Sequence, residues 1–124
     1  MKDSFLYIEN VSKSFDDVKA LDNVSLAINK SELFSLLGSS GCGKSTLLRI
    51  IAGFEKPDSG KIFLDGEDIT DLPAYKRPLN IMFQSYALFP HLNVSNNIAF
   101  GLKEDRLDKK EIENRTSEII NLLE

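Results

Sequence analysis

Four residues of the sequence have the types and spacing needed to hold phosphate groups. Gly38, Gly43, Lys44 and Ser45 satisfy the pattern G-x-x-x-x-G-K-S/T in full. An unbroken apolar run over residues 33–37 precedes the pattern, and a stretch with helical apolar spacing follows it. This strand–loop–helix context is the one in which the pattern binds nucleotide phosphates. The alternative, a glycine-rich turn that binds nothing, explains less of the context.

The glycines of this loop let consecutive backbone N–H groups face a single anion. The helix expected after the loop adds its free N–H groups and the positive end of its dipole. We expect Lys44 to reach the β- and γ-phosphates and the hydroxyl of Ser45 to bind Mg²⁺. Thr46 is placed on the α-phosphate side. The predicted phosphate-binding residues are Gly38, Ser39, Ser40, Gly41, Cys42, Gly43, Lys44, Ser45 and Thr46.

Cys42 is the single cysteine of the chain and lies inside the loop. A thiol beside Lys44 and a helix N-terminus has the surroundings that lower a thiol pKa, which is one route to a redox switch. A small spacer residue that contributes only its backbone N–H is the simpler interpretation, and the sequence favours it. One cysteine also excludes an internal disulfide, so a cytoplasmic location is expected.

The overall composition narrows the classes of function. Fifteen basic and nineteen acidic residues give a net charge of −4, which argues against broad nucleic-acid binding. Hydrophobic residues make up 42% and charged residues 27%, as in ordinary globular domains. No apolar run approaches the roughly 18 residues of a membrane span.

Apolar alternation and turn residues predict an α/β chain. The expected strands are residues 5–11, 20–28, 33–37, 61–64, 67–69 and 79–83, of which 33–37 and 79–83 are expected to be buried parallel strands. Asp16-Asp17 and Asp65-Gly66 are the expected turns, the second within a hairpin. A helix is predicted over residues 45–52, ended by Gly53.

The last third of the sequence predicts helices. Residues 94–102 read as a helix capped by Ser95. Asp108 and Glu111 form a capping-box pattern at the start of another helix. The apolar stripe of that helix, Ile112, Thr116, Ile119, Ile120 and Leu123, continues unbroken to the end of the chain.

These segments together resemble the ATP-binding subunit of ABC transporters, in particular importer subunits for polyamines (spermidine or putrescine). The resemblance is carried by GSSGCGKST at 38–46, PDSG at 57–60, FQSYALFPHL at 83–92 and NIAFGL at 97–102. It implies a P-loop NTPase fold of the ABC nucleotide-binding type, with an antiparallel β subdomain and the start of a helical subdomain. The implied boundaries are 1–84 for the β subdomain with the phosphate-loop core, and 85–124 for the Q-loop segment and helical start.

The resemblance also assigns roles to single residues. Phe15 takes the place of an aromatic that stacks on adenine, with an ordinary core or turn aromatic as the alternative. Val18 packs beside the sugar. Gln84 reaches Mg²⁺ and the attacking water through its side-chain amide, unless it is merely a polar residue that ends a strand. Lys44 and Gln84 are therefore the expected catalytic residues, and Ser45 and Gln84 the expected metal ligands.

The same resemblance implies partners and a location. The surface over residues 84–92, including Tyr86, would meet a transmembrane permease subunit, although a small core cluster would also use such residues. His91 matches a subunit-contact position and not a catalytic base. A second ATP-binding subunit, ATP and Mg²⁺ complete the expected assembly at the cytoplasmic face of the cell membrane, with no nucleic acid.

Several parts of an ABC-type ATPase have no counterpart in the sequence: the apolar strand that ends in Asp-Glu, the Leu-Ser-Gly-Gly-Gln signature and a late histidine. Residues 62–65 form a short apolar run that ends in Asp65, like the missing strand, but Asp65-Gly66 is better explained as a hairpin turn. We therefore expect the N-terminal portion of a longer subunit that binds nucleotide weakly and hydrolyses little by itself. A non-hydrolysing remnant and a small P-loop kinase are the alternatives. The arginines at 49, 77, 106 and 115 are too scattered to suggest a kinase lid.

Overall fold

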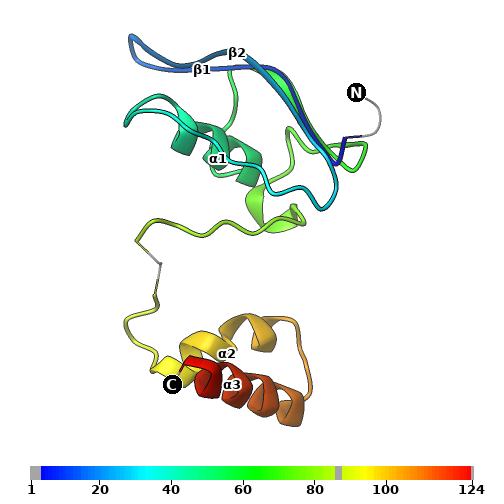
Figure 1. The fold of residues 1–124 in the computed structure, drawn as a ribbon, viewed down its shortest axis with the longest axis vertical. Helices are drawn as coiled ribbons and strands as arrows, with labels where there is room; N and C mark the ends of the chain where they lie inside the picture. The colour runs from blue at the N-terminus through cyan, green and yellow to red at the C-terminus, as the bar shows by residue number, and fades with distance from the viewer. Residues whose placement is uncertain (1–3, 86–87, 124) are drawn as a thin grey trace. The chain divides into compact units, whose positions relative to one another are not determined.

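The computed structural model describes residues 4–85 and 88–123, and the chain divides into two compact units, Met1–Ile81 and Met82–Glu124 (Figure 1). The first unit combines a β-sheet with one helix and a short 3-10 turn, η1 (Ala74–Lys76). The second is a pair of helices. The antiparallel sheet and the helical start expected from the sequence are therefore both present.

The sheet of the first unit is antiparallel throughout. Its strands are β1 (Leu6–Phe15), β2 (Val18–Ile28), β3 (Ser59–Leu64) and β4 (Glu67–Asp68), in the order β2-β1-β3-β4. Asp16 and Asp17 form the turn between β1 and β2, as predicted. Asp65 and Gly66 both have positive φ, 48° and 84°, as a type I′ hairpin turn requires.

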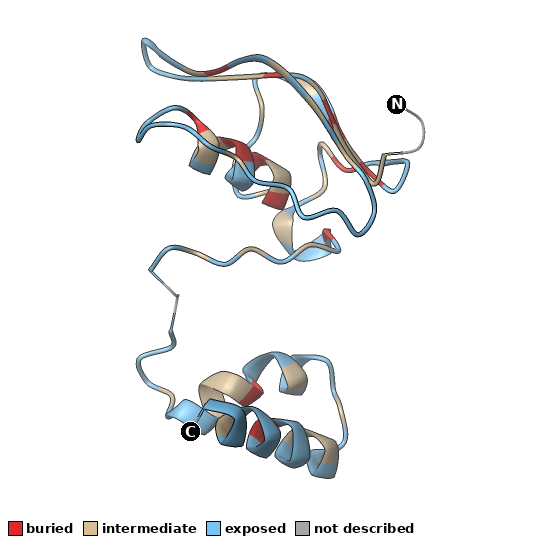
Figure 2. Ribbon diagram, in the orientation of Figure 1, coloured by how far each residue is buried: buried red, intermediate tan, exposed pale blue. Residues whose placement is uncertain are grey.

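Helix α1 (Lys44–Ala52) lies against one face of this sheet (Figure 1). Its apolar side chains join those of the strands in a single core of Ile8, Val11, Leu21, Leu47, Ile50, Ile62, Leu64 and Ile69. Figure 2 shows the buried residues on the side of α1 that faces the strands. Gly53 ends the helix in a left-handed conformation, as expected from the sequence.

The two parallel strands predicted from apolar runs are not formed. Residues 33–37 and 79–83 have no strand pairing, and Leu33, Leu37 and Met82 are 97%, 93% and 84% exposed. A parallel strand needs ladder hydrogen bonds to its neighbours and cover on both faces. In the described part of the chain, the only sheet is the antiparallel one, which includes neither run. Apolar character alone therefore did not make these segments strands.

The second unit pairs α2 (Val94–Glu104) with α3 (Lys109–Leu123). The predicted cap of α2 is corrected by two residues: Asn93, not Ser95, caps it, accepting a hydrogen bond from Asn96 N at 2.8 Å. Asp108 accepts from Lys110 N at 3.2 Å, as a cap of α3 should. Glu111 pairs with Arg115 at 2.6 Å in place of the reciprocal capping-box contact.

Candidate nucleotide site: a phosphate loop in front of α1

The loop before α1 brings its backbone close to β2. Gly43 has a φ of 93° and is buried, and a Cβ at this position would collide with the carbonyl oxygen of Ala20. Only glycine combines this left-handed conformation with such a close approach. Gly41 also has positive φ, 80°, but faces open space. The loop is thus fixed to the sheet at Gly43 and open at Gly41.

The N-terminus of α1 is free to take an anion. Gly43 is its N-cap and supplies no side-chain hydrogen bond, and its first turn carries no acidic residue. The free N–H groups and the positive end of the helix dipole therefore have no side-chain competitor there. Ser45 is exposed and Thr46 half-buried on this first turn. The predicted hydroxyl ligand thus lies where a phosphate-bound Mg²⁺ could use it.

Lys44 is folded back onto the loop. Its Nζ donates to the carbonyl oxygens of Gly38 at 2.6 Å and Ser39 at 2.8 Å, and contacts Cys42 Sγ at 3.2 Å. These contacts gather the charged group and both ends of the loop into one place. The ammonium therefore lies inside the loop, and its contact with the β- and γ-phosphates stays a prediction.

Two features of Cys42 bear on its two interpretations, a reactive thiol and a spacer. The hydrogen bond from Lys44 lowers the pKa of its exposed thiol from the ordinary value. Its backbone N–H donates to Ser39 O at 3.3 Å, so the residue also closes the loop as a spacer. A Cβ at Gly38 would lie 2.5 Å from Sγ, which explains a glycine at that position.

The predicted base-stacking residues lie at the turn of the β1–β2 hairpin in the same unit. Phe15 and Val18 are directly paired across the two strands, and both are exposed, Phe15 at 45%. Ala20, two residues along β2 from Val18, meets Gly43 of the phosphate loop. Phe15 is therefore not a core aromatic, and β2 links the hairpin end to the loop.

Sequence reasoning missed Lys13, which lies next to Phe15. Its Nζ is 5.3 Å from the centroid of the Phe15 ring and forms ion pairs with Glu55 at 3.1 Å and Asp58 at 3.2 Å. The carboxylates belong to the segment between α1 and β3, which is distant in sequence. The sequence offered no local signal for this cluster, because Lys13 and Phe15 lie outside the predicted strands of residues 5–11 and 20–28.

Arg77 is the second residue whose role the sequence did not reveal. It is buried, and its guanidinium donates to the carbonyl oxygens of Ile50, Ile51, Thr70 and Leu72 at 2.7–3.0 Å. Burial lowers the pKa of this group from its ordinary value, while Asp71 opposes the shift. Two of the four acceptors are in the last turn of α1, where a cation complements the helix dipole. Arg77 therefore fixes the end of the helix that starts at the phosphate loop.

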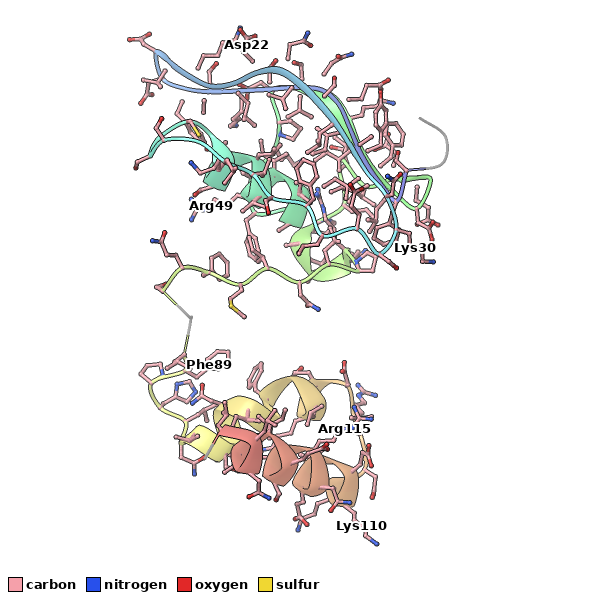
Figure 3. The ribbon with its side chains drawn as sticks, viewed as in Figure 1. Asp22, Lys30, Arg49, Phe89, Lys110 and Arg115 are labelled. Carbon is pink, nitrogen blue, oxygen red and sulfur yellow. The ribbon has the colours of Figure 1, made fainter. Side chains whose placement is uncertain are left out.

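Gln84 and the predicted permease-contact segment belong to the second unit. Gln84 is exposed, and its roles at Mg²⁺ and water remain predictions. Phe89, labelled in Figure 3, packs 4.4 Å from Phe100 and 6.0 Å from His91 between ring centroids. Asn97 holds this segment through the backbone of Phe89 and Leu92. Tyr86 and Ala87 of the same segment lie outside the described residues.

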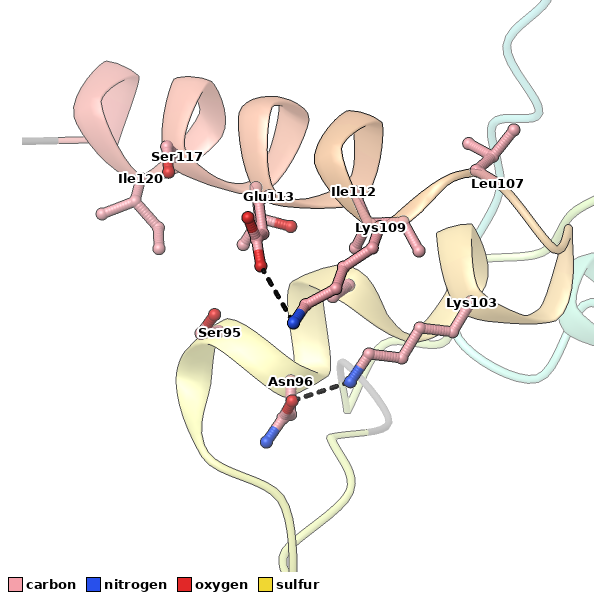
Figure 4. Close-up of a pocket in the computed structure, with 11 residues that line it drawn as sticks. Ser95, Asn96, Lys103, Leu107, Lys109, Ile112, Glu113, Ser117 and Ile120 are labelled. Carbon is pink, nitrogen blue, oxygen red and sulfur yellow. Dashed lines mark hydrogen bonds and ion pairs between the residues drawn. The ribbon is translucent and has the colours of Figure 1, made fainter.

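A groove of about 420 Å³ lies between α2 and α3 (Figure 4). Several polar groups at its rim contact one another: Lys103 donates a hydrogen bond to Asn96 at 2.8 Å, and Lys109 forms an ion pair with Glu113 at 3.9 Å. The groove contains none of the predicted nucleotide-binding residues. The phosphate loop of the first unit therefore remains the candidate site.

The profile of the ABC transporter family matches residues 21–124, which include the phosphate loop, α1 and both helices of the second unit. The chain belongs to the ABC transporter family. It is 59% identical over 118 residues to the putrescine transport ATP-binding protein PotG of Escherichia coli, covering 95% of this chain and 31% of that protein. It is 60% identical over 116 residues to the spermidine/putrescine import ATP-binding protein PotA of Thermotoga maritima, covering 94% and 32%. The chain thus spans about a third of the length of these relatives.

A solved structure confirms the fold. The ATP-binding cassette MJ0796, in a dimeric post-hydrolysis state bound to ADP and Pi, superposes with a TM-score of 0.79 at 29% identity. The match covers 91% of this chain and 54% of the cassette. The fold is accordingly that of an ABC ATPase domain, of which this chain holds a part.

No helix in residues 4–85 and 88–123 has the length and apolar character needed to cross a membrane. In the same ranges, no group of three or more His, Cys, Asp or Glu side chains could hold a metal ion.

Proposed function

We propose that this chain binds ATP with Mg²⁺ at the loop of residues 38–46. The observation that carries the proposal is the open N-terminus of α1, with Lys44 Nζ already held at the loop by Gly38 and Ser39. Backbone N–H groups and Lys44 hold the phosphates, and Ser45 offers its hydroxyl to the metal. Phe15 stacks on the adenine and Val18 lies beside the sugar.

We further propose that this site belongs to the energy-coupling subunit of a polyamine importer. The names of two relatives, a putrescine transport and a spermidine/putrescine import ATP-binding protein, support the substrate class. In this role, residues 84–92 contact a permease subunit, Gln84 reaches the metal and the attacking water, and a second ATP-binding subunit completes a dimer. The assembly works at the cytoplasmic face of the cell membrane.

The proposal treats nucleotide binding and ATP hydrolysis as separate properties of this chain. The 124 residues hold a phosphate loop but no Asp-Glu strand end and no Leu-Ser-Gly-Gly-Gln signature. Phosphoryl transfer needs a group that positions water and charges that stabilise the transferred phosphate as well as a cradle. The chain by itself is therefore proposed to bind nucleotide without sustained turnover, and steady-state ATP hydrolysis by the purified chain would contradict this part.

Calorimetric titration with ATP and Mg²⁺ tests the binding site. Lys44→Ala removes charge-assisted hydrogen bonds to the phosphates and should weaken binding by about tenfold or more. Lys30→Ala is the matched control, because Lys30 is an exposed lysine outside the predicted site in the same unit. Equal affinities of the two variants would refute the proposed role of the loop.

A chimera tests the link to import. This chain replaces the matching 118 residues of the Escherichia coli putrescine transport ATP-binding protein, which it matches at 59% identity. Uptake of labelled putrescine by cells that carry only the chimera should be restored, and Lys44→Ala in the chimera should abolish it. A stably expressed chimera without uptake would contradict the importer role of these residues.

A further inference from the structure

Lys13 is held in a fixed place on one side of the Phe15 ring. Its side chain is only 13% exposed, and its Nζ lies 3.1 Å from Glu55, 3.2 Å from Asp58 and 5.3 Å from the ring centroid. A surface lysine usually moves freely because its stem has four rotatable bonds. Two carboxylates and an aromatic ring around one ammonium remove much of that freedom.

We infer that Lys13 is a positioning residue that orients Phe15 for an adenine base and so makes the site prefer a nucleoside triphosphate to a bare polyphosphate. The inference rests on the proposed function, in which Phe15 stacks on the base. The ammonium covers one face of the ring, because a cation is attracted to the electron-rich face of an aromatic. The opposite face is then the one that receives the base.

Asp58 joins this contact to the backbone around Phe15. Its carboxylate accepts a hydrogen bond from Ser14 N at 2.7 Å, and its own N–H donates to Ser12 O at 2.9 Å. Hydrogen bonds to Glu55 and Asp58 raise the pKa of Lys13 above the ordinary lysine value, so the ammonium stays charged at neutral pH. Asp58 thus joins the segment after α1 to the end of β1 that carries both Lys13 and Phe15.

Phe15 needs such support. It is the last residue of β1, it is 45% exposed, and Asp16 after it has a positive φ of 49°. A ring in this position has little core packing to restrict it, and a base that stacks on it must pay for ordering it. Lys13 lowers that cost by ordering the ring before the base arrives.

The test compares two ligands on the purified chain by calorimetry: ATP, which has a base, and inorganic tripolyphosphate, which has none. Lys13→Met keeps the length of the stem and removes the charge. We expect it to weaken ATP binding about three- to tenfold, the range of one cation–π contact and a better-ordered ring, with tripolyphosphate affinity unchanged. Lys13→Arg keeps both ion pairs and the cation and should retain the affinity for ATP.

A double-mutant cycle shows whether Lys13 acts through Phe15. In a Phe15→Leu background, Lys13→Met should have no further effect on ATP affinity, since no ring remains to be oriented. An equal loss with and without the ring would overturn the inference. So would a Lys13→Met variant that loses both ligands together, because that result means a general role in the fold. Should this variant not fold, Glu55→Gln removes one ion pair and must weaken ATP selectively, or the inference fails.

The wild-type measurements separate this inference from the proposed function. A chain that binds neither ligand contradicts the proposed phosphate site and the inference with it. Selective ATP binding that Lys13→Met leaves unchanged overturns the inference alone. Equal affinity for ATP and tripolyphosphate refutes the base contact of Phe15 and therefore the inference, while the phosphate loop stands.

Discussion

The two units of this chain exclude water to very different extents. The first has a continuous apolar core from all three longer strands, α1 and Ile69. Among the described residues of the second, only Ala99 and Thr116 are buried, and Thr116 Oγ1 has no hydrogen-bond partner (Figure 2). Small side chains at this contact let α2 and α3 approach but bury little apolar area.

This difference bears on how each unit can serve the site. A phosphate loop must hold its backbone N–H groups in place before the ligand arrives, and a packed sheet and helix supply that rigidity. The helix pair has no comparable core, so we expect it to open more readily than the first unit. Hydrogen exchange measured amide by amide can test this expectation, because it gives the opening free energy of each unit separately.

The core substitution Ile50→Ala should have the largest effect. Ile50 is fully buried, and removing its side chain leaves a cavity, so the first unit should lose about 3 kcal/mol of unfolding free energy. Ile119→Ala in α3, where the side chain is 43% exposed, is the control and should change the second unit by less than about 1 kcal/mol. Similar losses in the two units would remove the contrast.

Arg77→Ala should cause the second-largest loss of unfolding free energy. It leaves four backbone carbonyls without their guanidinium donors, and about 2–3 kcal/mol should be lost from the first unit. Arg115→Ala breaks an exposed pair with Glu111 in α3 and should cost about 0.5 kcal/mol or less. Chemical denaturation followed by circular dichroism measures both; an Arg77 variant as stable as the Arg115 variant would contradict the assigned role.

Threonine-to-valine substitution should stabilise the second unit at one position and destabilise the first unit at another. Thr116→Val replaces an unpaired buried hydroxyl with a methyl group and should stabilise the second unit by about 1 kcal/mol. Thr70→Val removes a hydroxyl that accepts from Ile62 N at 2.9 Å and donates to Asp68 at 2.6 Å, so the first unit should lose about 1–2 kcal/mol. Hydrogen exchange on both variants checks the signs, and a destabilised Thr116 variant would indicate a partner for that hydroxyl.

Lowering the pH should produce the smallest of these changes in stability, and it should act on the first unit. Hydrogen bonds from Ser14 N–H and Lys13 hold the pKa of Asp58 below its ordinary value of 3.8. A depressed folded-state pKa gives stability that is present above the unfolded value and is lost as the pH falls through the folded one. Unfolding midpoints of the first unit should therefore drop below about pH 4, and less steeply in Asp58→Asn. An identical acid profile for the variant would show that Asp58 contributes nothing there.

Local rules predicted much of the fold. Turn chemistry located both hairpins, and helical apolar spacing located α1, α2 and α3, since these features depend on residues near one another in sequence. The cap of α2 was misplaced by two residues because Ser95 and Asn93 are both good caps, and only the backbone shows which one accepts from Asn96. The prediction of parallel strands at residues 33–37 and 79–83 was wrong, because strand formation depends on neighbouring strands that a local apolar pattern does not reveal.

The sequence by itself determined where the proposed phosphate site lies. Its glycines, lysine and serine must be contiguous, because backbone N–H groups and a helix N-terminus have to converge on one anion. Only the tertiary structure revealed what supports that site. Arg77 reaches α1 from 26 and 27 residues away, and Lys13 meets Asp58 from 45 residues away. Such contacts are created when the sheet and the helix pack, and no local pattern encodes which distant carbonyl or carboxylate a charged side chain will find.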